Sequence, residues 1–142
     1  MYWKCILVSA LATILHDDEN LEFHIAPMQC YTNQPLRRLF HLLSPSSTKW
    51  TEMEKVDDLY PNVRKAFEKR LGSGDYFDET NLILQLGSNN PDKLHSCVET
   101  VLEQYNNNLR GININCGCPA IDTGGSSTYG ASLMKDPSLT AR

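Results

Sequence analysis

A short, uninterrupted apolar segment near the middle of the chain constrains the fold most strongly. Residues 81–86, Asn-Leu-Ile-Leu-Gln-Leu, place apolar side chains on both faces of an extended strand. Such a strand must be covered on both faces, which is typical of a parallel sheet. Because parallel neighbours are joined by long and usually helical crossovers, the segment predicts an alternating β/α chain.

The segments around this strand repeat the alternation. Strands are expected at 21–26, 49–53, 81–86 and 111–115, and helices at 36–43, 62–71 and from 91 to about 105. Asn33-Gln34-Pro35 is a start signal for the first helix, and Gly72 is a stop signal for the second. Asp136-Pro137 would begin a further helix. The pattern predicts an α/β fold of the (β/α)8 TIM-barrel type, with about the first four β/α units present.

Chain length limits the domain organisation. A complete barrel of this type takes about 250 residues, so we expect residues 21–142 to form its N-terminal half. Residues 1–20 are expected to be an extension of uncertain role. Their apolar run Cys5–Leu15 has the length of a signal-peptide core, is too short for a membrane span, and is favoured as a packed apolar helix or a segment outside the fold. Half a barrel has two open sheet edges, so the isolated chain is expected to self-associate.

Composition excludes several classes of protein. The net charge of −4 argues against a chain whose whole surface binds nucleic acid. Five cysteines form an odd set without a repeated C-x-x-C pair, so neither a disulfide framework nor a metal site is expected. We expect a reduced, cytoplasmic setting without a membrane partner; an organellar location stays open because of the N-terminal apolar run.

Polar residues and one thiol gather where the strands end. Cys118 lies on a Gly-Cys-Pro turn after the fourth strand, Asn115 ends that strand, Gln85 lies in the third, and Ala26-Pro27-Met28 closes the first. The carboxyl ends of parallel strands share one rim, where active sites of such folds lie. A planar heteroaromatic cofactor is expected there, read by the two amides. The alternatives are that Cys118 packs as a small apolar residue and that Gln85 caps a sheet edge.

Other side chains are expected to serve structure. Cys116 alternates away from Cys118 and is interpreted as a packing residue. The apolar positions of the first helix form one face, and Arg37 and Arg38 would lie on a solvated face or touch phosphate.

The order of the motifs resembles the tRNA-dihydrouridine synthases, closest to the type A group. The resemblance rests on six motifs in order: Ala26-Pro27-Met28, Thr32 with Arg37 or Arg38, Thr51-Glu52-Met53, Gln85-Leu86-Gly87, Asn113-Ile114-Asn115-x-Gly117-Cys118-Pro119 and Tyr129–Met134. It implies an FMN-binding barrel that reduces uridine in tRNA to 5,6-dihydrouridine, with NADPH reducing the flavin.

The resemblance also implies roles for single residues. Those at Ala26, Pro27, Met28 and Gln85 would contact FMN, and Asn115 would lie in the flavin and substrate pocket. Cys118 would donate the proton to uracil C5 while hydride reaches C6; a thiol ordinarily titrates near pH 8.5 and so holds its proton at neutral pH.

The chain departs from the family where Asn33 replaces the usual aspartate and Ala120 the usual serine. Two alternatives remain: a non-catalytic truncated fragment of such an enzyme, or an FMN barrel of the dihydroorotate dehydrogenase kind. Gly117 counts against the second, because that family tends to have serine there.

Overall fold

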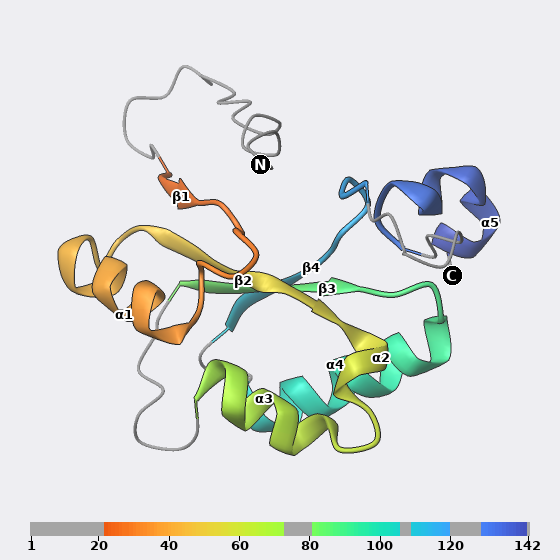
Figure 1. Cartoon of the computed structure of the whole chain (residues 1–142), viewed down its shortest axis with the longest axis horizontal. Helices are drawn as coiled ribbons and strands as arrows, with labels where there is room; N and C mark the ends of the chain where they lie inside the picture. Colours follow the sequence, from red (N-terminus) through yellow and green to blue (C-terminus); the bar gives the residue numbers. More distant parts are fainter. Residues whose placement is uncertain (1–21, 73–80, 106–108, 120–128, 142) are drawn as a thin grey trace.

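The computed structural model describes residues 22–72, 81–105, 109–119 and 129–141. In chain order (Figure 1), the elements are β1 (His24–Ile25), α1 (Gln34–Leu43), β2 (Thr48–Lys55), α2 (Val56–Leu59), α3 (Val63–Leu71), β3 (Leu82–Gly87), α4 (Pro91–Tyr105), β4 (Leu109–Ile114), the 3-10 helix η2 (Gly130–Lys135) and α5 (Pro137–Thr140). The strands form one parallel sheet in the order β1-β2-β3-β4. This confirms the expected α/β fold, which is consistent with part of a (β/α)8 barrel.

Local signals in the sequence mark the helix ends correctly. The Asn33 side chain caps α1 by accepting the Leu36 N–H at 3.2 Å. Gly72 ends α3 with a φ of 104°, a left-handed value that glycine adopts without a side-chain clash. Asp136 caps α5 by accepting the Leu139 N–H at 2.9 Å. None of the described helices is long and apolar enough to cross a membrane.

The strand ends differ from the prediction. β1 is shorter than expected, because Ala26 is already exposed and Pro27 has no N–H for a ladder. β2 runs on to Lys55, and the polar stretch after it contains the short helix α2. Burial of apolar side chains explains why α2 forms: Val56 and Leu59 are 0% and 1% exposed and belong to the hydrophobic core.

The hydrophobic core lies between the sheet and the helices α2, α3 and α4, which gather on one side of it (Figure 1). Leu84 and Leu86 of β3, Phe67 of α3 and Val101 of α4 are completely buried. Because side chains alternate along a strand, Ile83 and Gln85 lie on the face of β3 opposite these helices. The apolar side chains of α4 are only partly in the core: Val101 and Tyr105 are buried, whereas Leu102 is 42% exposed.

Helix α1 contradicts the expected distribution of charge. Arg37 was expected on a solvated face or in contact with phosphate, but it is 2% exposed, whereas Leu39, Leu42 and Leu43 are 49%, 65% and 72% exposed. The reason is local hydrogen bonding: the Arg37 guanidinium donates to the Thr32 carbonyl at 2.8 Å. Helical periodicity cannot reveal such a partner.

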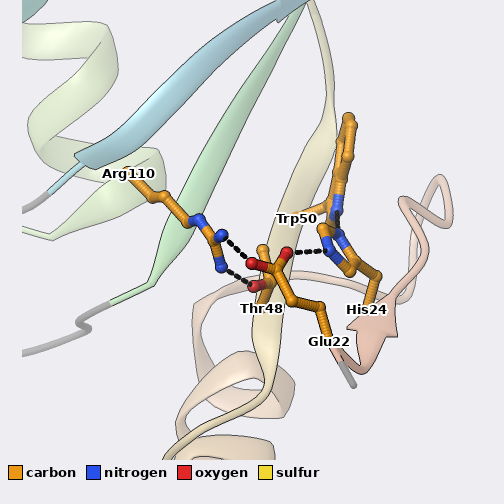
Figure 2. Close-up of polar contacts among 5 residues, drawn as sticks. All are labelled: Glu22, His24, Thr48, Trp50 and Arg110. Carbon is orange, nitrogen blue, oxygen red and sulfur yellow. Dashed lines mark hydrogen bonds and ion pairs between the residues drawn. The ribbon is translucent and has the colours of Figure 1, made fainter. Parts of the chain in front are cut away.

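A polar cluster joins both edges of the sheet near the amino ends of the strands (Figure 2). Arg110 of β4 donates to Thr48 of β2 at 2.6 Å and to Glu22, just before β1, at 2.5 Å. Trp50 of β2 donates to His24 of β1 at 3.1 Å. Since β1 and β4 are the outer strands of the sheet, these contacts tie its first strand to its last.

The hydrogen bonds of this cluster determine the tautomer of the His24 ring and lower the pKa of Glu22. The indole N–H can only donate, so Nδ1 of His24 accepts, and the ring proton sits on Nε2, which faces Glu22 at 3.1 Å. Hydrogen bonds from Arg110 and then His24 lower the pKa of Glu22 below its ordinary value of 4.5. The cluster therefore stabilises the fold above that ordinary value and loses this contribution as the pH falls through the lowered one.

Charge reversal tests the cluster. We expect Glu22→Arg and Arg110→Glu each to speed hydrogen exchange of the Thr48 amide several-fold. That amide donates to the carbonyl of Phe23, the residue just before β1, at 2.8 Å. The double reversal should restore much of the protection, since the opposite charges meet again. After correction for intrinsic exchange, protection should also fall as Glu22 is protonated. Additive effects in the double variant would contradict the pairing.

Candidate functional site

Three side-chain amides form a connected chain across the carboxyl-terminal halves of β3 and β4. Gln85 donates from Nε2 to Oδ1 of Asn113 at 3.0 Å, and Asn115 donates from Nδ2 to Oε1 of Gln85 at 3.2 Å. Gln85 and Asn113 are opposite each other in the parallel register, and Asn115 follows two residues later on the same face. The sheet register thus brings together the predicted pair Gln85 and Asn115.

The backbone N–H groups of Gln85 and Asn115 are hydrogen-bonded to neighbouring strands. The Gln85 N–H donates to Oγ1 of Thr51 on β2 at 3.0 Å, and Thr51 is 0% exposed. The Asn115 N–H donates to the Leu86 carbonyl at 2.8 Å and so extends the ladder beyond β4. A polar side chain within an apolar strand needs a partner, and the two asparagines provide it for Gln85.

The same asparagine holds the turn that carries the thiol. Oδ1 of Asn115 accepts the backbone N–H groups of Gly117 at 3.0 Å and Cys118 at 2.8 Å, which is an Asx-type turn. On the other side, the Cys118 carbonyl accepts the Ala131 N–H at 3.0 Å. Gly130 permits this approach: a Cβ there would lie 2.2 Å from the Cys118 oxygen. The backbone of Cys118 is therefore held from both directions.

The described cysteines occupy different environments. Cys118 is half-buried, whereas burial of Cys97 raises the pKa of its thiol to about 11. The expectation that Cys116 packs in the interior is wrong, because it is exposed. Cys116 lines a surface pocket of about 350 Å³ with Leu133 and Met134. Alternation after β4 separates it from the Asn115 side chain, so it lies beside η2 rather than in the core.

The predicted segment Ala26-Pro27-Met28 lies at the carboxyl end of β1. Ala26 is exposed, Pro27 is half-buried, and the Met28 side chain is 36% exposed. Within the described residues, the hydrogen bonds of Met28 run to Tyr31 and Thr32 of its own loop. This segment shares the sheet end with the amide chain but is not linked to it by a hydrogen bond shown there.

Sequence reasoning did not predict the contacts of several residues in this region. Asn113 was seen only as part of a motif, although its spacing of two from Asn115 is the signal that both share a face. Thr51 gave no such signal, since its role depends on the β2–β3 register. Lys55 lies over the Tyr129 ring, with its Nζ 5.5 Å from the ring centroid.

No group of three His, Cys, Asp or Glu side chains that could hold a metal ion occurs among the residues described.

Asn115 variants test how the turn is held. Asn115→Ala should speed exchange of the Gly117 and Cys118 amides about fivefold or more, since each lost hydrogen bond contributes about 1 kcal/mol. Asn115→Asp keeps the acceptor oxygen and should protect both amides, while it loses the donor to Gln85. Alkylation of Cys118 in a Cys116→Ser background reports on the same turn. Equal exchange in the Ala and Asp variants would contradict this arrangement.

Comparison with known proteins extends the geometric picture. Residues 24–142 match the family model described as dihydrouridine synthase. A tRNA-dihydrouridine(20/20a) synthase of Shewanella oneidensis is 32% identical over 133 residues, which cover 89% of this chain and 36% of that protein. The synthase of the same name from Xanthomonas campestris is 32% identical and covers 87% of this chain and 34% of its own length.

The extent of these matches defines what they show. The chain spans about a third of the length of these curated relatives. The family model covers far more than half of this chain and includes every residue of the amide chain and the thiol turn. The match to this family model does not favour the alternative of a dihydroorotate dehydrogenase-type barrel. The chain belongs to the dihydrouridine synthase family.

Proposed function

We propose that this chain forms the flavin- and uridine-facing part of an FMN-dependent tRNA-dihydrouridine synthase of the type A group. The whole protein would reduce uridine in tRNA to 5,6-dihydrouridine in the cytoplasm, with NADPH as the electron source. The observation that carries the proposal is the Asn115 carboxamide, which joins Gln85 to the Cys118 turn where β3 and β4 end. Membership of the family and the names of the relatives support it.

The donor set at this sheet end suits an isoalloxazine ring. A carboxamide nitrogen carries two hydrogens, and Gln85 and Asn115 each use one within the amide chain. The second hydrogen of each is suited to the carbonyl oxygens and ring nitrogens of a flavin. Ala26, Pro27 and Met28 would lie along the flavin edge, and Met28 contributes an accessible thioether. When bound, FMN supplies the hydride.

Cys118 would be the general acid. Reduction of the uracil C5–C6 bond adds a hydride at one carbon and requires a proton at the other, so a proton donor is needed near C5, and the Cys118 S–H would supply it. Asn115 contributes by holding the Cys118 backbone rather than its sulfur, which leaves the thiol able to donate. The half-buried position limits access of water.

The remaining assignments follow from the same proposal. The substrate is tRNA, and the relatives' names point to uridines at positions 20 and 20a. Residues 1–20 remain a proposed extension, and 21–142 a proposed half-barrel domain. Self-association of the isolated chain is proposed as well, supported by the exposed leucines of α1 and by the edge positions of β1 and β4 in the sheet.

A Cys118 variant separates the two half-reactions. In the protein that carries these residues, Cys118→Ala should lower dihydrouridine formation in tRNA by about 10²–10⁴-fold, the usual contribution of a general acid. NADPH-driven flavin reduction should stay nearly unchanged, because that half-reaction transfers a hydride to the flavin and does not require Cys118 to protonate a carbon. Cys116→Ser is the matched control and should retain both half-reactions. Equal loss of both in Cys118→Ala would argue against the acid role.

A second candidate follows from the coverage. Because the match extends over only about a third of each relative, a non-catalytic fragment of such an enzyme is the alternative. The two candidates differ in one measurement, the dihydrouridine content of tRNA incubated with FMN, NADPH and the protein that carries these residues. Product above the level of a Cys118→Ala control supports the enzyme, and its absence supports the fragment.

A further inference from the structure

The loop after β1 is closed by a buried threonine. Oγ1 of Thr32 accepts the Met28 N–H at 3.0 Å and donates to the Met28 carbonyl at 3.1 Å. The same carbonyl accepts the N–H groups of Tyr31 at 3.0 Å and Thr32 at 2.9 Å. Thr32 is 0% exposed, although the residues between it and Met28 are exposed. Both polar backbone groups of Met28 are thus held by one side chain and its neighbours.

Arg37 connects this closed loop to the rest of the fold. Its Nη1 donates to the Thr32 carbonyl at 2.8 Å, and its Nη2 approaches the Arg70 carbonyl near the end of α3 at 3.4 Å. Arg37 as a whole is 2% exposed. Two carbonyls separated by 38 positions in the chain are bridged by one planar group, which a lysine ammonium, as a point charge, cannot reproduce.

The energetic cost of burying Arg37 argues against a role in which its side chain only fills space. Removing a charged group from water is costly, and an apolar side chain of similar size would fill the space without that cost. The leucines of the same helix are nevertheless exposed while the arginine is inside. The arrangement is explained if the position of the Thr32 carbonyl, and through it that of Met28, must be held.

We infer that Arg37 and Thr32 are positioning residues for the flavin-facing segment Ala26-Pro27-Met28. This inference rests on the proposed function. Thr32 sets both backbone groups of Met28, and Arg37 anchors Thr32 to α3, so the segment keeps one shape before any ligand arrives. Preorganisation of this kind lowers the entropic cost of binding a rigid, planar ring.

Substitutions in the full chain test the inference by hydrogen exchange. Arg37→Met and Thr32→Val should speed exchange of the Tyr31 and Thr32 amides about tenfold, as expected when hydrogen bonds that hold the loop are lost. The Leu84 and Leu86 amides in the core should stay within about twofold. Thr32→Ser keeps the hydroxyl and should rescue the loop. Arg38→Met, on the exposed neighbouring position of α1, is the matched control and should leave the loop amides unchanged.

The second readout is FMN affinity, measured by fluorescence anisotropy of FMN as each full-chain variant is added. Arg37→Met and Thr32→Val should raise the dissociation constant about fivefold or more, and Thr32→Ser and Arg38→Met should not, because only the first two release the Met28 segment. Unchanged loop exchange, equal acceleration in loop and core, or faster loop exchange with an unchanged dissociation constant would each overturn the inference and leave the proposed function standing. Absence of FMN binding by the protein that carries these residues would overturn both.

Discussion

The hydrogen bonds of the Asn115 side chain are the interaction on which the site depends. Its oxygen holds the backbone of Gly117 and Cys118, and its nitrogen reaches Gln85 on the neighbouring strand. The position of the Cys118 backbone is therefore a consequence of sheet register rather than of an independent loop. A shift of β4 by one residue would move Asn115 to the helix-covered face and separate the thiol turn from Gln85.

Different parts of the sheet serve stability and the candidate site. Its helix-covered face packs Leu84 and Leu86 against Phe67 and Val101, and this apolar contact supplies the core. Its amino-terminal end is tied by the ionic contacts around Arg110, and its carboxyl-terminal end carries the amide chain. This division is the usual one in (β/α)8 folds, whose binding sites lie at the carboxyl ends of the strands.

The sequence was sufficient to predict the parallel α/β fold and the location of Gln85 and Asn115 at one end of the sheet, because both follow from local periodicity and from the shared direction of the strands. It did not predict that the two side chains are hydrogen-bonded to each other. It was not sufficient for Arg37. A charge at a helical position indicates a solvated face unless a distant carbonyl receives it, and the Arg70 carbonyl comes from another helix. Cys116 was misplaced for a related reason: alternation gives the side of a strand, but not whether another segment covers it.

The most direct test of the central claim is a map of the backbone amides that respond when FMN is added to the isotopically labelled chain. We expect the largest NMR shift changes at Met28, Gln85 and the residues from Asn115 to Cys118, with little change on α3 and α4. Changes concentrated on those helices, or at the amino-terminal cluster around Arg110, would show that the flavin does not bind where β3 and β4 end and would contradict the account.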